Sequence, residues 1–528
     1  MISGAETALS AEERQDQRWQ ITLLILLLGY LLAFAIINFQ GLTRFIDPDS
    51  YSDTVAARYM WEQKTLFPKG WVFGNQYYVV ATPVLAALFY GLTGSMNLAM
   101  ALATTAMTLF QLAALAWLLR SFLGRTQVLA GLTALVASVL AMNLRFKLDA
   151  QLLFLLGGYY GCYLLTLLVV WGDYTQGLFK GKQILCPAFF LGLFLSFATG
   201  MQSIRQTCIM VMPLLAFEGL RVLYMLVRRT ARDWMPTLRT VCVTAANLAG
   251  VVLIRCLHVP ALSVYGETKL IRPEQLPQQL KNLQEAALKV TGLLWYRECT
   301  PAWFVVGFSV LCCGTVILAL ARAAGRLKRG EAGPLDALIA LCVISLAAVA
   351  VSGLLFNILL RSPYFFVWYL LVCLSAVSLV GKGRGKQAAL FLLCGAAAVN
   401  LWYSYKPNVA QSIRADNSVW AEVADELTEQ NYEILYGRYW DTGIICAHTD
   451  GKVLYSPWFF EAFNPLTYIC PQDLRGPEDH LRGVYLILDD ERENARLRAE
   501  EVGAELTLVR EFGGMALYTS SKQLMYPG

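Results

Sequence analysis

Long apolar runs separated by short polar segments dominate roughly the first 405 residues of the chain. A helix needs about 20 mostly apolar residues to cross a bilayer, and a helix in lipid satisfies its own backbone hydrogen bonds. The pattern therefore predicts eleven membrane-spanning helices. They are expected near residues 21–39, 97–119, 127–143, 150–171, 184–200, 206–227, 237–257, 302–321, 335–356, 363–381 and 387–404.

One further uncharged run, residues 76–94, contains Pro83 and several glycines, and we interpret it as a membrane-dipping or interfacial segment. With this assignment, the short loops on one side carry 15 Lys or Arg residues and those on the other side carry 4. The positive-inside rule then makes the first side cytoplasmic. The N-terminus is expected in the cytoplasm, and the loops 40–75 and 259–300 and the chain after Ser404 are expected outside it.

The composition agrees with this topology, because 57% of the residues are hydrophobic and the mean hydropathy is +0.49. Both values exceed those of ordinary soluble domains, so the chain is predicted to be an α-helical polytopic membrane protein. The net charge of +5 is spread over the predicted cytoplasmic loops and gives no reason to propose nucleic-acid binding.

The sequence changes character after residue 405, where charged and apolar residues alternate more closely. Residues 420–430 are typical of an amphipathic helix, and 485–488 and 506–509 are typical of strands around a charged helix. The pattern predicts a C-terminal extracytoplasmic α/β domain. The predicted domains are residues 1–405, which form the membrane domain, and residues 406–528.

Thirteen cysteines are present, and most lie in or beside apolar runs, where cysteine is typically a small core residue. The three histidines are far apart in sequence and no Cys-x-x-Cys pair accompanies them, which argues against a structural zinc site. Cys446 and Cys470 both fall in the C-terminal domain. They could form a disulfide in an oxidising compartment or remain two free thiols.

Carboxylates follow the first apolar run, in the segment Asp47-Pro48-Asp49-Ser50. At the edge of a bilayer such a group can act as a general base, and Asp49 is our candidate. Asp47 and Asp149 could orient it, share a divalent metal ion with it, or raise its pKa by like-charge proximity. The alternative is that the segment is only a turn or a helix N-cap, for which Asp and Ser are also favoured.

Three arginines lie at or near predicted outer membrane ends: Arg361, Arg205 and Arg255. A guanidinium there can bind a lipid phosphate through two hydrogen bonds. Arginines at the ends of spans also extend to lipid headgroups without any catalytic role. Both interpretations stay open for Arg205 and Arg255.

Several short motifs resemble the GT-C glycosyltransferases, in particular the group of protein O-mannosyltransferases and lipid A aminoarabinose transferases. Asp49 followed by Ala57-Arg58-Tyr59-Met60 and Pro68 resembles the first outer loop of that group. Pro83-Val84-Leu85 before Tyr90, Arg145 to Asp149, and Arg361-Ser362-Pro363-Tyr364 resemble its later elements in the same order. The second acidic position of the group is Ser50 here, so both Asp49 and the upstream Asp47 are candidates for the base.

The resemblance implies an inverting glycosyltransferase that uses a polyprenyl-phosphate-linked sugar on the extracytoplasmic side. In this interpretation Arg361 binds the donor phosphate, and Arg58 and Tyr364 belong to the acceptor or loop region. Lys269 and Arg272, beside an amphipathic helix expected from Glu274 to Val290, could cover the site. The same segment could be simple interfacial packing.

A transporter or flippase of a lipid-linked saccharide is the alternative function. Such proteins usually carry charged or broken helices at mid-membrane and an internal repeat, and the sequence has few charges inside its spans and no repeat. A membrane-anchored binding protein is a third interpretation, although eleven spans exceed what an anchor needs. No cofactor is required by the first interpretation, and a divalent metal ion remains open.

Overall fold

The computed structural model describes most of the chain. The described residues are 10–45, 48–140, 160–181, 185–228, 233–257, 259, 270–293, 302–356, 360–381, 383–404, 409–459 and 461–526. Asp47, Asp149 and Lys269 lie outside these ranges, so the structural statements below do not concern them.

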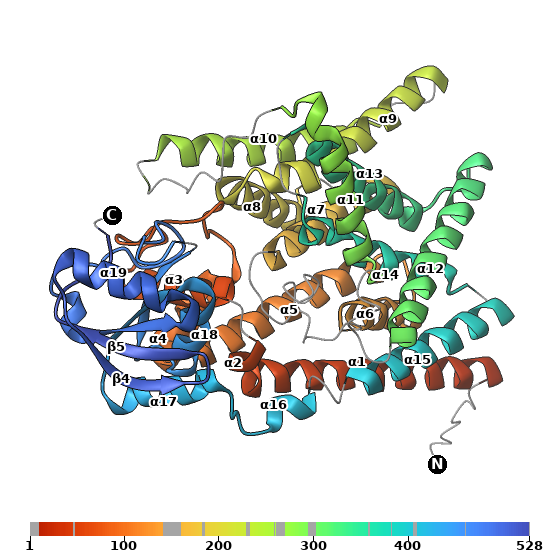
Figure 1. The fold of residues 1–528 in the computed structure, drawn as a ribbon. Helices are drawn as coiled ribbons and strands as arrows, with labels where there is room; N and C mark the ends of the chain where they lie inside the picture. The colour runs from red at the N-terminus through yellow and green to blue at the C-terminus, as the bar shows by residue number, and fades with distance from the viewer. Residues whose placement is uncertain are drawn as a thin grey trace, which may run out of the picture.

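Helices occupy the predicted apolar runs wherever these are described, and they pack side by side in a bundle (Figure 1). Seven helical segments among the described residues are long and apolar enough to cross a membrane, which agrees with a multi-pass membrane protein. The predicted count of eleven stays a prediction. The helices over these runs are α1 (Ala11–Gln40), α5 (Met96–Arg120), α6 (Arg125–Leu140), α7 (Gly161–Lys180), α8 (Pro187–Gln202), α9 (Met212–Arg228) with the π-helix η3 (Thr207–Val211), α10 (Met235–Cys256), α12 (Ala302–Lys328), α13 (Pro334–Leu355), α14 (Val367–Leu379) with the 3-10 helix η6 (Ser362–Phe365), and α15 (Arg384–Ser404).

Two predicted boundaries are wrong, because helices α7 and α12 continue through segments expected to be loops. Helix α7 extends to Lys180, and its Asp173 forms a buried ion pair with Arg239 of α10. Helix α12 extends to Lys328, and its Arg326 forms an ion pair with Asp336 at the start of α13. Charged residues therefore continue these helices because partners on neighbouring helices neutralise them.

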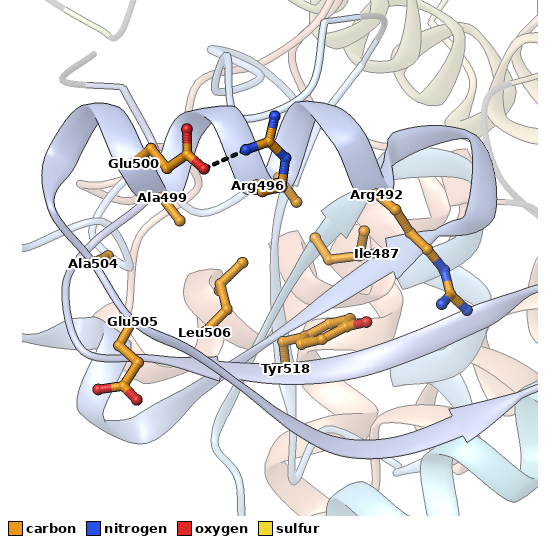
Figure 2. Close-up of a pocket in the computed structure, with 10 residues that line it drawn as sticks. Ile487, Arg492, Arg496, Ala499, Glu500, Ala504, Glu505, Leu506 and Tyr518 are labelled. Carbon is orange, nitrogen blue, oxygen red and sulfur yellow. Dashed lines mark hydrogen bonds and ion pairs between the residues drawn. The ribbon is translucent and has the colours of Figure 1, made fainter.

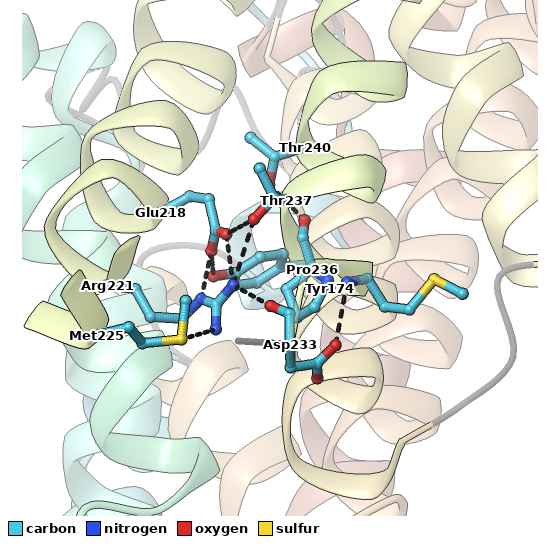
Figure 3. A network of polar contacts seen from close by, with 9 residues as sticks. Tyr174, Glu218, Arg221, Met225, Asp233, Pro236, Thr237 and Thr240 are labelled. Atoms are coloured by element: carbon cyan, nitrogen blue, oxygen red, sulfur yellow. Dashed lines mark hydrogen bonds and ion pairs between the residues drawn. The ribbon is translucent and has the colours of Figure 1, made fainter. Parts of the chain in front are cut away.

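A second polar cluster joins α7, α9 and α10 close to that ion pair along the chain (Figure 3). Glu218 accepts hydrogen bonds from Tyr174 at 2.6 Å and from Arg221 at 2.7 Å. Thr237 donates to the same carboxylate, and Arg221 also reaches the backbone carbonyl of Asp233 at 2.9 Å. This network satisfies a buried carboxylate inside the bundle, as buried charges require.

Helices α8 and α10 approach each other very closely at two glycines. A Cβ atom at Gly250 would lie 2.1 Å from the carbonyl oxygen of Phe197, and one at Gly200 would lie 2.2 Å from that of Asn247. The Asn247 side chain donates to the Ser196 carbonyl at 2.9 Å. Small residues that let helix backbones meet, with a polar side chain across the contact, are typical of membrane bundles.

Two shorter helices lie in the segments predicted to be interfacial. Helix α4 (Thr82–Thr93) has 12 residues, which is too short to span a bilayer and agrees with a dipping segment. Helix α11 (Leu276–Val290) follows the 3-10 turn η4 (Pro273–Gln275) and coincides with the predicted amphipathic helix. It packs against η6 and α13, and its last carbonyl, that of Val290, accepts a hydrogen bond from Tyr369.

A five-stranded mixed sheet forms the C-terminal part of the protein, in the order β2-β1-β3-β5-β4. Strands β1, β2 and β3 are parallel, whereas β5 pairs antiparallel with β3 and β4. The predicted strands correspond to β3 and β4, and β1, β2 and β5 are additional. The bounds are β1 (Ile434–Arg438), β2 (Leu454–Trp458), β3 (Gly483–Leu488), β4 (Leu506–Phe512) and β5 (Met515–Ser520), with helices α17 (Val419–Glu429), α18 (Tyr439–His448) and α19 (Arg492–Val502).

The two faces of this sheet belong to different apolar cores. One face, with Leu435 and Leu486, shares a continuous cluster of buried residues with the helical bundle. The other face, with Tyr436 and Tyr485, packs beneath Ala495 of α19 in a separate cluster. Figure 1 shows the sheet against one end of the bundle, beside helices α3 (Pro48–Gln63) and α4. The sheet is therefore packed onto the bundle through an apolar interface.

Cys446 and Cys470 are buried and free, so the structure contains the two thiols and no disulfide between them. Burial raises the pKa of the Cys470 thiol to about 11, and its sulfur donates to the Leu466 carbonyl at 3.1 Å. Two protonated, buried thiols behave as small core residues.

Candidate active site

Helix α3 carries the candidate carboxylates. It begins at Pro48, a residue favoured in the first turn of a helix, and Asp49 follows at a position where the helix dipole stabilises a negative charge. Almost every residue in its first three turns is buried, although the helix has a polar composition. This happens because α3 lies between α4 and α5 of the bundle and α18 of the C-terminal part.

Asp49 faces the C-terminal part of the protein. The buried hydroxyl of Tyr439, the first residue of α18, donates a hydrogen bond of 2.7 Å to its carboxylate. Ser52, one turn behind, lies 3.1 Å from the Tyr439 hydroxyl and 2.7 Å from that of Tyr455. Burial, and then the charge of Asp49, raises the pKa of Tyr439 well above its usual value, so this phenol is a donor. The contact holds Asp49 in one orientation.

Asp53, one turn after Asp49, has its partner in a different part of the chain, the loop between α3 and α4. Its side chain is 1% exposed and accepts a hydrogen bond from the buried hydroxyl of Tyr78. A carboxylate buried to this degree is costly unless hydrogen bonds compensate it. The sequence did not point to Asp53. The signal available was its spacing of four residues from Asp49, which places both side chains along one helix.

The loop that carries Tyr78 is anchored on the ends of two bundle helices. Gln202, at the end of α8, accepts the Tyr77 N–H at 3.0 Å through its backbone and the Val79 N–H at 3.3 Å through its side chain. Gln76 accepts from the Tyr163 hydroxyl of α7 at 2.6 Å. These contacts fix the partner of Asp53 relative to the bundle.

Arg205 lies immediately after α8, three residues beyond Gln202, and is half-buried. Its guanidinium carbon is 5.2 Å from the ring centroid of Tyr364 in η6, a cation–π geometry. Tyr160 stands 6.4 Å from Tyr364 and 6.3 Å from Tyr163, ring centre to ring centre. The structure therefore brings together two residues predicted from the sequence, Arg205 and Tyr364. Through Tyr160 and Tyr163, the same row of aromatic rings reaches the loop beside Asp53.

The π-helix η3 begins two residues after Arg205. The Ser345 side chain of α13 donates to the carbonyl of Ile209 within it at 2.7 Å. Such π-turns inside helices are rare and occur frequently at functional sites.

The remaining predicted residues are spread around this region. Arg58 of α3 donates to the Gly451 carbonyl at 2.8 Å and pairs with Glu62, so it joins α3 to the C-terminal part. Arg361 is exposed and precedes η6 directly, three residues before Tyr364. Arg255 and Arg272 are exposed, near the end of α10 and at the start of η4.

No metal cluster marks the site in the described part of the chain. No group of three or more His, Cys, Asp or Glu residues among the described residues could hold a metal ion. A pocket of about 380 Å³ lies elsewhere, between α19 and strands β4 and β5, with Arg496, Glu500, Leu506 and Tyr518 in its wall (Figure 2). It contains none of the residues predicted from the sequence.

The fold has counterparts among solved structures. The apo crystal structure of ArnT from Cupriavidus metallidurans matches with a TM-score of 0.54 and 11% identity, over 96% of this chain and 98% of that one. ArnT from the same organism bound to undecaprenyl phosphate matches with a TM-score of 0.55 and 11% identity, over 96% and 99%. By sequence, no family model and no curated protein matches the chain. The chain therefore has the fold of ArnT, a lipid A aminoarabinose transferase of the GT-C glycosyltransferase class, which confirms the resemblance expected from the sequence.

Proposed function

We propose that the protein is a membrane glycosyltransferase that moves a sugar from a polyprenyl-phosphate carrier to an acceptor hydroxyl. The observation that carries the proposal is the ArnT fold over 96% of the chain, together with two carboxylates on α3 where the sheet meets the bundle. A neighbour with this fold was crystallised with undecaprenyl phosphate, which supports a lipid phosphate as the leaving group. By the family resemblance, the configuration of the sugar is inverted.

The reaction needs a base for the acceptor hydroxyl as the sugar carbon gains positive charge. Asp49 remains the first candidate, since it is half-buried and oriented by Tyr439. Asp53 is the second, because it is a buried carboxylate one turn away on the same helix. A base of this kind contributes about two to four orders of magnitude in rate.

The reaction also needs cations for the phosphate leaving group. Arg205 is supported by its half-buried guanidinium over Tyr364, and Arg361 by its place three residues before that ring. Charge-assisted, bidentate hydrogen bonds from arginine suit a phosphate. In this scheme the phosphate binds near η6, and α11, which packs on η6, covers that region.

The proposed topology places the Asp49 side of the bundle and residues 406–528 outside the cytoplasm, with residues 1–405 as the membrane domain. The proposal is supported by the unequal distribution of Lys and Arg between the loops. Cysteine probes introduced near Asp49 and in the C-terminal domain should react with an impermeant reagent added from outside. A probe in loop 228–239 should not.

The experiment that tests the function uses purified protein and a panel of radiolabelled polyprenyl-phosphate sugars, with release of the free carrier phosphate as the readout. Asp49→Asn and Asp53→Asn keep the shape of each side chain and remove its basicity. Asp473→Asn is the matched control, because this carboxylate also accepts a tyrosine hydrogen bond from α3, from Tyr59 at 2.8 Å.

The variant that removes the base should lose about two to four orders of magnitude in transfer rate while donor binding survives. The Asp473 variant should stay within a few-fold of the parent. If both α3 variants fold and transfer sugar at the parent rate, the proposal is wrong and a flippase of a lipid-linked saccharide becomes the better explanation.

A further inference from the structure

An aromatic surface lies at the carboxyl ends of two parallel strands. Trp440 follows β1 by two residues and is 43% exposed, and Phe459 directly follows β2 and is half-buried. Their ring centres are 6.0 Å apart. We call these two side chains the Trp440 platform. In sheets with parallel strands, ligands bind characteristically at the carboxyl ends of the strands.

Charged side chains occupy the same edge of the sheet. Arg438, the last residue of β1, pairs with Asp441 at 2.8 Å and with Asp490, just after β3, at 3.7 Å. The Arg438 side chain is partly exposed and Asp490 is largely exposed. A donor and an acceptor with room for further hydrogen bonds, Arg438 and Asp490, therefore lie at the same edge of the sheet as Trp440.

The platform is also continuous with the candidate base. The ring of Tyr439 lies 5.3 Å from Trp440 and 6.1 Å from Phe459, centre to centre. The hydroxyl of the same tyrosine donates to Asp49. The Tyr439 side chain therefore separates a molecule on the platform from the Asp49 carboxylate, so the platform would hold a part of the acceptor other than its reacting hydroxyl.

We propose that the Trp440 platform binds a saccharide unit of the acceptor. The inference rests on the proposed glycosyltransferase function and adds the chemical class of the acceptor. A sugar ring has apolar C–H faces and a rim of hydroxyls. It matches an exposed aromatic ring flanked by an arginine and carboxylates, because small-ligand sites combine an apolar surface with a few polar groups. A lipid chain is disfavoured here, since it would desolvate the neighbouring charges without replacing their hydrogen bonds.

The test uses the full-length protein in nanodiscs, with maltotriose, mannotriose and chitotriose as probes. Saturation-transfer NMR and tryptophan fluorescence measure binding, and donor turnover is measured separately by release of carrier phosphate. The variants are Trp440→Ala and Trp440→Phe, which keeps an aromatic ring. Trp402→Ala is the matched control, because Trp402 is 70% exposed on α15, away from the sheet.

At least one trisaccharide should bind the parent, and Trp440→Ala should weaken that binding about tenfold, a change of about 1.4 kcal/mol. Trp440→Phe should keep a measurable part of the affinity, and Trp402→Ala should bind as the parent does. The inference is overturned if no trisaccharide binds or if Trp440→Ala binds normally. Quenching of the fluorescence by brominated lipids that is clearly weaker in Trp440→Phe than in the parent would also overturn it, because Trp440 would then contact the bilayer.

These outcomes are separable from the fate of the proposed function. If the parent transfers sugar and Trp440→Ala leaves the KM for the acceptor unchanged, the proposed function stands and the saccharide-binding role of the platform is wrong. A parent that binds a trisaccharide through Trp440 but never releases carrier phosphate keeps the saccharide site and refutes the transferase.

Discussion

Replacing Arg239 with methionine should destabilise the bundle strongly. The Arg239 side chain is 1% exposed and that of its partner Asp173 is 5% exposed, so neither is compensated by water. Removing one member of such a pair leaves a buried charge and costs about 3–5 kcal/mol in the free energy of unfolding. Gly177 adds a steric constraint, because a Cβ atom there would lie 2.7 Å from the Arg239 Nε. The arginine side chain therefore packs directly against Gly177 and leaves no room for a larger residue at that position.

The loss can be measured by SDS-induced unfolding in mixed micelles, followed by circular dichroism. Arg329→Met is the matched control, since Arg329 forms an ion pair with Glu331 in which the two side chains are 60% and 58% exposed. Exposed pairs contribute about 0–1 kcal/mol. The double variant Asp173→Leu with Arg239→Met should recover most of the stability, because no unpaired charge remains. An Arg239→Met variant no less stable than Arg329→Met would refute the reasoning.

Two further predictions concern the proposed donor site and the sheet. Arg205→Ala or Arg361→Ala should raise the apparent KM for the polyprenyl-phosphate donor about tenfold or more, as expected for the loss of a charge-assisted hydrogen bond, and Arg329→Ala, a change in an exposed surface ion pair, should leave it unchanged. Burial raises the pKa of Glu491 despite its hydrogen bond from Trp458. A raised pKa favours the protonated folded form, so this carboxyl stabilises the fold at low pH and the contribution is lost as pH rises through the folded pKa. Glu491→Gln should therefore raise Tm at pH 8 and change it little below the unfolded pKa of about 4.3; the same effect at both pH values would contradict this sign.

Hydropathy alone located the helices, because a run of about 20 apolar residues in lipid has few alternatives to a helix. It could not locate the ends of α7 or α12. Those helices continue through Asp173 and Arg326, whose charges are neutralised by residues on other helices. Sequence patterns do not contain that information, since each partner is chosen by packing.

The sheet was predicted only in part, for a related reason. Strand β3 is a continuous buried run and was found, as was β4. Strand β1 has only five residues and includes Gly437, and α18, which follows it directly, includes Gly443. A short strand and a short helix that each contain glycine give a weak sequence pattern. They form because neighbouring strands pair with β1 and α3 packs against α18.

At the candidate site, too, local sequence patterns indicated some residues and gave no signal for others. The role of Asp49 was predicted from a short motif and that of the arginines from the predicted topology, and both stay predictions. The buried Asp53 was missed because its burial depends on Tyr78, which lies in a loop. Tyr439 was missed because nothing in its local sequence indicates a partner on α3.

The hydrogen bond between Tyr439 and Asp49 also constrains when Asp49 can be oriented during synthesis of the protein. The two residues are 390 positions apart. At about 5–20 residues per second, roughly 20–80 s separate their emergence from the ribosome. During that interval α3 has been synthesised, but the tyrosine that orients the Asp49 carboxylate has not. The contact can therefore form only after the last apolar helix, α15, has been synthesised. A chain whose synthesis stops before Tyr439 would lack this orientation of Asp49.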